Sequence, residues 1–164
     1  MTTPRIGQGF DVHRLVAGRP LRLGGVELDH ARGLEGHSDG DCVLHAVCDA
    51  LLGAIGAGDM GAHFPSRDPR WHGAESRVFV EAVARQLASA GFRLENLDVT
   101  VIAQEPTLAP HLDAMRATIA KLLGAPRDAV SVKAKSVDHL GAIGRGEGIA
   151  ALAVALLVKE ANGA

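Results

Sequence analysis

Hydrophobic and polar positions follow two different periods along this chain, and each change of period marks a predicted element. Four segments have the pattern of strands: residues 5–13, 21–28, 96–104 and 129–136. Three segments have apolar residues three and four positions apart, as helices do: the stretch between residues 39 and 56, residues 75–90 and residues 110–123. Ser38 or Asp39 is predicted to cap the first helix, and Gly56 or Gly58 to end it.

The last apolar segment, residues 148–158, fits two structures. Its alanines favour a helix, whereas its short length and β-branched residues suit a buried strand. Polar, glycine-rich segments are predicted as loops: residues 29–36, 59–76 and 139–148. Strands followed by helices and then further strands predict an α+β fold with a mixed sheet. A length of 164 residues with 47% hydrophobic residues predicts one domain, residues 1–164.

Composition excludes several classes of function. A net charge of −2 and an aromatic content of 3% argue against nucleic-acid binding, which needs a basic surface and stacking residues. The longest apolar stretch is too short to cross a bilayer, and the N-terminus lacks the apolar segment of a signal peptide. Cys42 and Cys48 are predicted to be reduced and buried rather than disulfide-bonded. These features predict a cytoplasmic protein that does not bind membranes.

Asp11 and His13 lie two positions apart in the first predicted strand, so their side chains project from the same face. His45 lies in the first predicted helix, on a polar line with Asp41 and Asp49, and ligating histidines commonly donate their second N–H to a carboxylate. If strand and helix face each other, Asp11, His13 and His45 form a three-ligand zinc site with one open position. The alternative is that His45 is a histidine at the edge of the core, hydrogen-bonded to a neighbour.

Several motifs together resemble one family. "GFDVHR", "GHSDGDCVLHAVCDALLGAIGAGDMGAHFP", "DVTVIAQEP" and "GRGEGI" are similar, in order and spacing, to the 2-C-methyl-D-erythritol 2,4-cyclodiphosphate synthases of the non-mevalonate isoprenoid pathway. The resemblance runs nearly from end to end. It implies a mixed four-stranded sheet with helices on one face, a small N-terminal hairpin, and a homotrimer with active sites between subunits. Because the first strand starts near residue 5, we expect a free-standing domain.

The resemblance also implies an activity. The family converts 4-diphosphocytidyl-2-C-methyl-D-erythritol 2-phosphate into the cyclic diphosphate and CMP. It implies Zn²⁺ or another divalent metal at Asp11, His13 and His45. A second ion, Mg²⁺ or Mn²⁺, is implied to bridge the substrate phosphates next to Asp138, which stands where the family has Glu.

The resemblance assigns catalytic roles to His37 and Ser136, the latter in place of a family Thr. It implies that the following positions contact the substrate: Asp11, His13, His37, Ser38, Asp59, Met60, Gly61, Phe64, Pro65, Asp68, Ala103, Gln104, Pro106, Leu108, Lys135, Ser136, Asp138, Ala142 and Arg145. The competing interpretation of Ser38 is a helix cap. Arg145 and Glu147 are implied to lie near the three-fold axis, where a simple structural ion pair is the alternative.

This chain departs from the family pattern at a few positions. Ser66 and Arg67 replace the usual "DT" of "FPDTD", and Ala142 stands where a Phe is frequent. Thr107 stands where a Lys is common, and Lys135 is a candidate to compensate. Two other functions fit the same residues: a zinc-dependent hydrolase of nucleotide diphosphates, and a trimeric binding module with a structural zinc.

Overall fold

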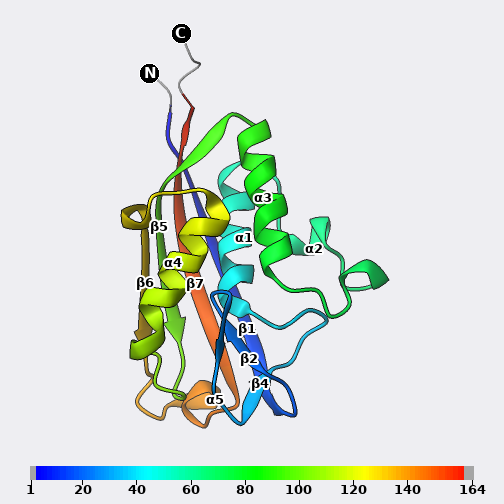
Figure 1. The fold of residues 1–164 in the computed structure, drawn as a ribbon, viewed down its shortest axis with the longest axis vertical. Coiled ribbons are helices and arrows are strands. Elements are labelled where there is room, and N and C mark those ends of the chain that lie inside the picture. Colours follow the sequence, from blue (N-terminus) through cyan, green and yellow to red (C-terminus); the bar gives the residue numbers. More distant parts are fainter. Residues whose placement is uncertain (1–2, 161–164) are drawn as a thin grey trace.

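The first strand, β1 (Arg5–Ala17), lies beside the last strand, β7 (Gly148–Lys159), in the computed structural model, which describes residues 3–160 (Figure 1). The two run antiparallel, with Arg5 opposite Leu157 and Arg14 opposite Gly148. On its other side β7 pairs antiparallel with β5 (Phe92–Ile102), which in turn pairs parallel with β6 (Val130–Lys135). Residues 148–158 therefore lie in a strand with a neighbour on each side, one of the two structures that their sequence fits.

The sheet is larger than the sequence predicted. Within the described residues it has five strands, in the order β4-β1-β7-β5-β6, and not four. The additional strand, β4 (Arg32–Leu34), lies inside the segment that was expected to be a loop, and pairs with the end of β1. Three residues are too few for a period to be recognised in the sequence.

Residues 21–28 form a separate hairpin and not one strand. Its strands are β2 (Leu21–Leu23) and β3 (Val26–Leu28), joined by Gly24 and Gly25. Both glycines have positive φ, 60° and 76°, as the tight turn between such strands requires. The small N-terminal hairpin that the resemblance implied is thus present.

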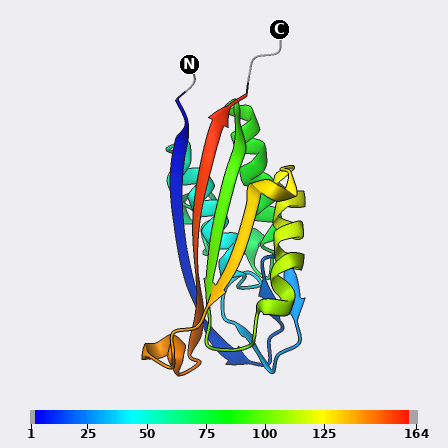
Figure 2. The same ribbon diagram turned by 90° about the vertical axis from the view of Figure 1, so that its left-hand side faces the viewer.

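The three long helices lie on one face of the sheet (Figure 2). They are α1 (Cys42–Ala54), α3 (Arg77–Ser89) and α4 (Leu112–Leu123). Two short helices, α2 (Met60–His63) and α5 (Gly141–Gly144), lie in the segments expected as long loops. Single 3₁₀ turns cover Pro69–Trp71, Ala109–His111 and Arg127–Ala129. Among residues 3–160, none of the helices combines the length and the apolar character needed to cross a membrane.

Two glycines of β1 set the distance between the sheet and α1. A Cβ atom at Gly7 would lie 1.9 Å from the carbonyl oxygen of Ala50, and one at Gly9 equally close to that of Ala46. Helix and strand backbones therefore approach as closely as only glycine allows. Because residues 7, 9, 11 and 13 share one face of β1, this close packing brings the first turns of α1 over Asp11 and His13.

Asp41, and not Ser38 or Asp39, caps α1. Its fully buried carboxylate accepts hydrogen bonds from the backbone N–H of Val43 and Leu44, both at 3.1 Å. It also accepts from Gly24 at 2.9 Å and Gly25 at 2.7 Å, which ties the β2–β3 hairpin to the start of α1. Asp41 thus has a structural role that its helical spacing from His45 did not reveal.

The opposite face of the sheet carries exposed apolar side chains. Ile6, Phe10 and Val12 of β1 are 70%, 54% and 50% exposed, and Val154 of β7 is 45% exposed. Residues 6, 10 and 12 share a face of β1, and Val154 lies opposite Gln8 on the neighbouring strand. The four therefore form one apolar surface, which we call the outer sheet face.

Candidate metal centre and cleft

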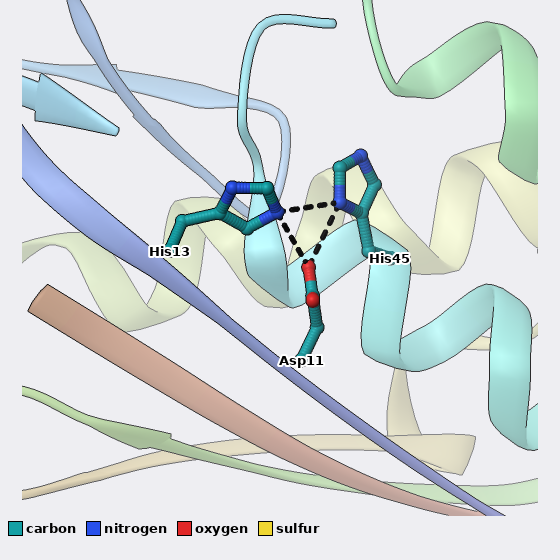
Figure 3. A group of neighbouring side chains, drawn as sticks. All are labelled: Asp11, His13 and His45. Atoms are coloured by element: carbon teal, nitrogen blue, oxygen red, sulfur yellow. Dashed lines mark hydrogen bonds and ion pairs between the residues drawn. The ribbon is translucent and has the colours of Figure 1, made fainter. Parts of the chain in front are cut away.

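Asp11 and His13 of β1 meet His45 of α1 (Figure 3), as predicted from the sequence. The Oδ2 atom of Asp11 lies 2.9 Å from Nε2 of His13 and 2.9 Å from Nδ1 of His45. The two imidazole nitrogens are 3.3 Å apart. One donor atom from each residue therefore faces a common point, the arrangement that binds a divalent metal with three protein ligands.

The outward-facing nitrogens of both imidazoles have their own partners. His13 Nδ1–H donates to the backbone carbonyl oxygen of Glu35, which is only an acceptor. His45 Nε2 lies 2.8 Å from the hydroxyl of Ser76 and 3.2 Å from that of Ser38. Contacts of this kind fix the ring orientation of metal-binding histidines.

The predicted support of His45 by Asp41 and Asp49 is wrong. Asp41 caps α1, and Asp49 accepts a hydrogen bond from the backbone N–H of Met60 at 2.8 Å. A position four residues away on a helix surface is close in space, but a backbone donor nearby claims each carboxylate instead.

Electrostatics favour a cation between the three side chains. Burial alone would raise the pKa of the Asp11 carboxyl, but hydrogen bonds from His13 and His45 outweigh it and hold that pKa well below its usual range. Burial alone would lower the pKa of His13, but its hydrogen bond to Asp11 outweighs this and raises it. A carboxylate that stays ionised beside two imidazoles is a donor set suited to a divalent metal, which replaces the protons between them.

Metal affinity is therefore expected to depend on pH. Below the raised pKa of His13 a proton occupies the nitrogen that faces Asp11, and the metal must displace it. For each proton that the metal must displace, the apparent metal affinity falls about tenfold for every pH unit below that pKa. Chelator-competition titrations between about pH 8 and pH 6 measure this; an affinity constant across that interval would contradict protonation at the ligands.

The candidate metal centre lies in the wall of a cleft of about 730 Å³. The cleft is lined by these residues: Asp11, His13, Arg19, Glu35, Gly36, His37, Ser38, His45, Met60, Gly61, Phe64, Ser66, Trp71 and Phe79. Eight of the site residues predicted from the sequence are therefore brought together here: Asp11, His13, His37, Ser38, His45, Met60, Gly61 and Phe64.

Arg19 is a cleft residue that sequence reasoning missed. Its guanidinium donates to the carbonyl oxygens of Gly36, at 3.0 Å, and Ser38, at 2.6 Å. It thereby holds the backbone on both sides of His37 and adds a positive charge next to the metal centre. An arginine between two predicted strands carries no signal of this, because its partners lie 17 and 19 residues further along the chain.

One wall of the cleft is aromatic. Phe64, Trp71 and Phe79 pack against each other with ring centroids 4.8 to 5.6 Å apart. The ring of Phe79 also lies 6.2 Å from that of His45. In a chain with only four Phe and one Trp, three of these five residues gather beside the metal centre and provide it with an apolar side.

Three predicted contact residues lie next to the cleft without lining it. Asp59 caps α2 through a hydrogen bond from the N–H of Ala62, and so orients Met60 and Gly61. Asp68 caps the turn at Pro69–Trp71 and pairs with Arg70. Pro65 follows Phe64 in the same loop.

The other predicted contact residues, which we call the second group, lie at the end of β6 and in the segments that follow β5 and β6. Ala103 N–H donates to the carbonyl oxygen of Lys135, and the side-chain oxygen of Gln104 accepts from the N–H of His139. The members of this group are Ala103, Gln104, Pro106, Leu108, Lys135, Ser136, Asp138, Ala142 and Arg145. The described residues that line the cleft include none of them. The predicted site residues of this chain thus fall into two groups, one in or next to the cleft and one outside its lining.

Comparisons with known proteins give one consistent result. The model of the YgbB family matches residues 4–158. A relative from Burkholderia thailandensis, a 2-C-methyl-D-erythritol 2,4-cyclodiphosphate synthase, is 59% identical over 157 residues, which is 96% of this chain and 97% of that protein.

Two solved structures also match almost the whole of this chain. The bifunctional IspDF from Campylobacter jejuni is 38% identical with a TM-score of 0.94; the match covers 98% of this chain and 43% of that longer one. IspF from Plasmodium falciparum, solved as a CDP complex, is 30% identical with a TM-score of 0.86, and the match covers 98% and 99% of the two chains. The family model and the relative both match almost the whole chain, so the protein belongs to the YgbB family.

Proposed function

We propose that this protein is an enzyme that converts 4-diphosphocytidyl-2-C-methyl-D-erythritol 2-phosphate into 2-C-methyl-D-erythritol 2,4-cyclodiphosphate and CMP. An oxygen of the 2-phosphate attacks the β-phosphorus and forms the new P–O bond. The bond from that phosphorus to the oxygen of CMP breaks, and CMP leaves with the electron pair. The observation that carries the proposal is the convergence of Asp11, His13 and His45 in the cleft of a chain 59% identical to a named synthase.

The chemistry demands cations and positioning. A phosphate monoester has a second pKa of about 6, so the nucleophile is already ionised and needs no general base. Repulsion between two anionic groups costs about 4 kcal/mol for unit charges 4 Å apart at an effective dielectric of about 20. Holding the flexible substrate in the ring-closing conformation supplies up to about 7–11 kcal/mol.

Residues of the cleft meet these demands. Asp11, His13 and His45 would hold Zn²⁺ or another divalent metal, whose chemistry is Lewis-acid polarisation of a phosphate oxygen. Arg19 contributes a fixed positive charge and holds the backbone of the His37–Ser38 dipeptide, from which side chains contact the phosphates. Met60 and Gly61 bind the erythritol part.

We propose that the second group of residues completes the site from a neighbouring subunit. Ala103, Gln104, Pro106 and Leu108 bind the cytidine, and Ser136 stabilises the transition state. Asp138 offers a carboxylate, the ligand type that Mg²⁺ or Mn²⁺ prefers, and such an ion would neutralise negative charge on the substrate phosphates. The CDP-bound structure of a relative supports a cytidine diphosphate ligand.

A homotrimer would bring the two groups together. The outer sheet face supports this, because Ile6, Phe10, Val12 and Val154 form an apolar surface of the kind that subunit interfaces bury. Ala142 and Arg145 would then lie near the three-fold axis. We also propose a cytoplasmic location, supported by Cys42 and Cys48, which are both buried and unpaired within residues 3–160.

Product analysis tests the proposed function. We expect purified protein incubated with the cytidyl substrate, Zn²⁺ and Mg²⁺ to yield CMP and the cyclic diphosphate, identified by mass spectrometry. Linear products carrying an oxygen from water would instead indicate a nucleotide diphosphate hydrolase. No turnover, together with a loss of stability on zinc removal, would indicate a binding module with a structural metal.

A further inference from the structure

Ser76 occupies the residue before α3, where a serine hydroxyl normally accepts a hydrogen bond from the first turn of the helix. Its hydroxyl makes no such bond to α3, whose residues 77–89 are all described. The side chain is fully buried and contacts two other groups instead. These are the carboxylate of Asp39, 2.5 Å away, and Nε2 of His45, 2.8 Å away. The Ser76 hydroxyl therefore bonds to a histidine of the candidate metal centre and does not cap its own helix, which calls for a functional explanation.

The direction of these hydrogen bonds follows from the chemistry of the partners. A carboxylate only accepts, so the single hydroxyl proton of Ser76 points to Asp39. The backbone N–H of Ser76 donates to the other carboxylate oxygen at 3.0 Å, which fixes the orientation of Asp39. The Ser76 oxygen must then accept from Nε2–H of His45. Nδ1 hydrogen-bonds to Asp11 in the metal-free protein. A metal that displaces the proton between these two atoms would meet the lone pair of Nδ1, because Nε2 keeps its own proton.

The proton on His45 Nε2 also determines how the Ser38 hydroxyl is used. Its hydroxyl oxygen accepts from the N–H of Gly40 at 3.3 Å and lies 3.2 Å from His45 Nε2, which carries a proton. Among the described residues, both contacts use the Ser38 oxygen as the acceptor. Its hydroxyl proton is therefore available to an anion in the cleft that Ser38 lines.

We propose that Ser76, held by Asp39, is a positioning residue that makes Nδ1 the metal-binding nitrogen of His45 and leaves the Ser38 hydroxyl free to donate to a substrate phosphate. The inference rests on the metal site of the proposed function and extends it by two residues that touch neither metal nor substrate. In other metal sites a carboxylate bonded directly to the histidine fixes its tautomer and ring orientation. Here Asp39 would have the same effect through the hydroxyl of Ser76.

The experiment measures zinc binding by the metal-free protein in competition with a chromophoric chelator. Partners of this kind contribute about 10–100-fold to metal affinity, and we expect a loss of that size for Ser76→Ala. Ser89→Ala, the same change at the exposed end of α3, is the matched control and should bind zinc like the wild type. Ser76→Thr keeps the hydroxyl and should restore most of the affinity. Thermal unfolding of each metal-free variant checks that the fold is intact.

The outcomes separate this inference from the proposed function. If the wild type binds zinc at Asp11, His13 and His45 but Ser76→Ala binds it equally well, the role of Ser76 is refuted and the metal site stands. If Ser76→Thr is folded and as weak as Ser76→Ala, the hydroxyl is not the cause, which also refutes it. If the wild type itself binds no zinc there, the proposed function fails first.

Discussion

Replacing His45 with alanine is expected to lower kcat/KM by about a thousandfold or more. The change leaves Asp11 and His13 as the two remaining donors of the centre, too few to hold a divalent metal against water. Lewis-acid stabilisation by a metal contributes several kcal/mol, and each 1.36 kcal/mol corresponds to about a factor of ten in rate. Steady-state release of CMP measures the loss, and zinc titration should show that affinity falls with it.

His111→Ala is the matched control. His111 lies just before α4, outside the residues that line the cleft, so its removal should leave kcat/KM unchanged. Thermal unfolding of both metal-free variants shows whether either change disturbs the fold. A folded His45→Ala protein with kcat/KM within about tenfold of the wild type would contradict a metal role for His45.

Mixed oligomers of two inactive variants, His45→Ala and Asp138→Ala, are expected to be active. His45→Ala damages the metal centre, and Asp138→Ala damages the second group of residues, which lies outside the lining of the cleft. If each site combines the metal centre of one subunit with the second group of the next, every mixed trimer has one undamaged site. Mixed trimers isolated through two different affinity tags should therefore have about a third of the wild-type activity per trimer.

Each variant alone provides the control, and both should be inactive. A Phe10→Asp change in the outer sheet face should prevent the restoration, because it places a charge on the apolar surface assigned to the interface. Mixed oligomers that stay as inactive as their parents would show that the two groups do not complete one site between subunits.

The Asp11–His13 pair of the candidate metal centre was predictable because its geometry is local, and the family resemblance implied the more distant His45. Asp11 and His13 share a face of a strand whatever else the chain does, and His45 follows the glycine-spaced contacts that set α1 on β1. The three long helices and the strands β1, β5 and β6 were predicted as well, whereas residues 21–28 form a hairpin and not one strand, and residues 148–158 were left open between helix and strand. Their alanines, which suggested a helix, are small because the buried face of β7 lies under α1.

What the sequence could not reveal depends on contacts between distant segments. Ser76 lies 31 residues from His45 and looks like an ordinary helix cap. Arg19 donates to the backbone of Gly36 and Ser38, 17 and 19 residues further along the chain. The polar line of Asp41, His45 and Asp49 was misleading, because periodicity shows which side chains share a face but not which backbone donors lie opposite. The strand β4 was missed because its partner, the end of β1, is specified only by the fold.

The central claim is that Asp11, His13 and His45 bind one divalent metal in the cleft. Anomalous diffraction at the zinc edge, from crystals of the protein grown with zinc, tests it directly. We predict a peak about 2.0–2.2 Å from Asp11 Oδ2, His13 Nε2 and His45 Nδ1 together. A peak bound through His45 Nε2, or a zinc-containing crystal with no peak between these three atoms, would contradict it.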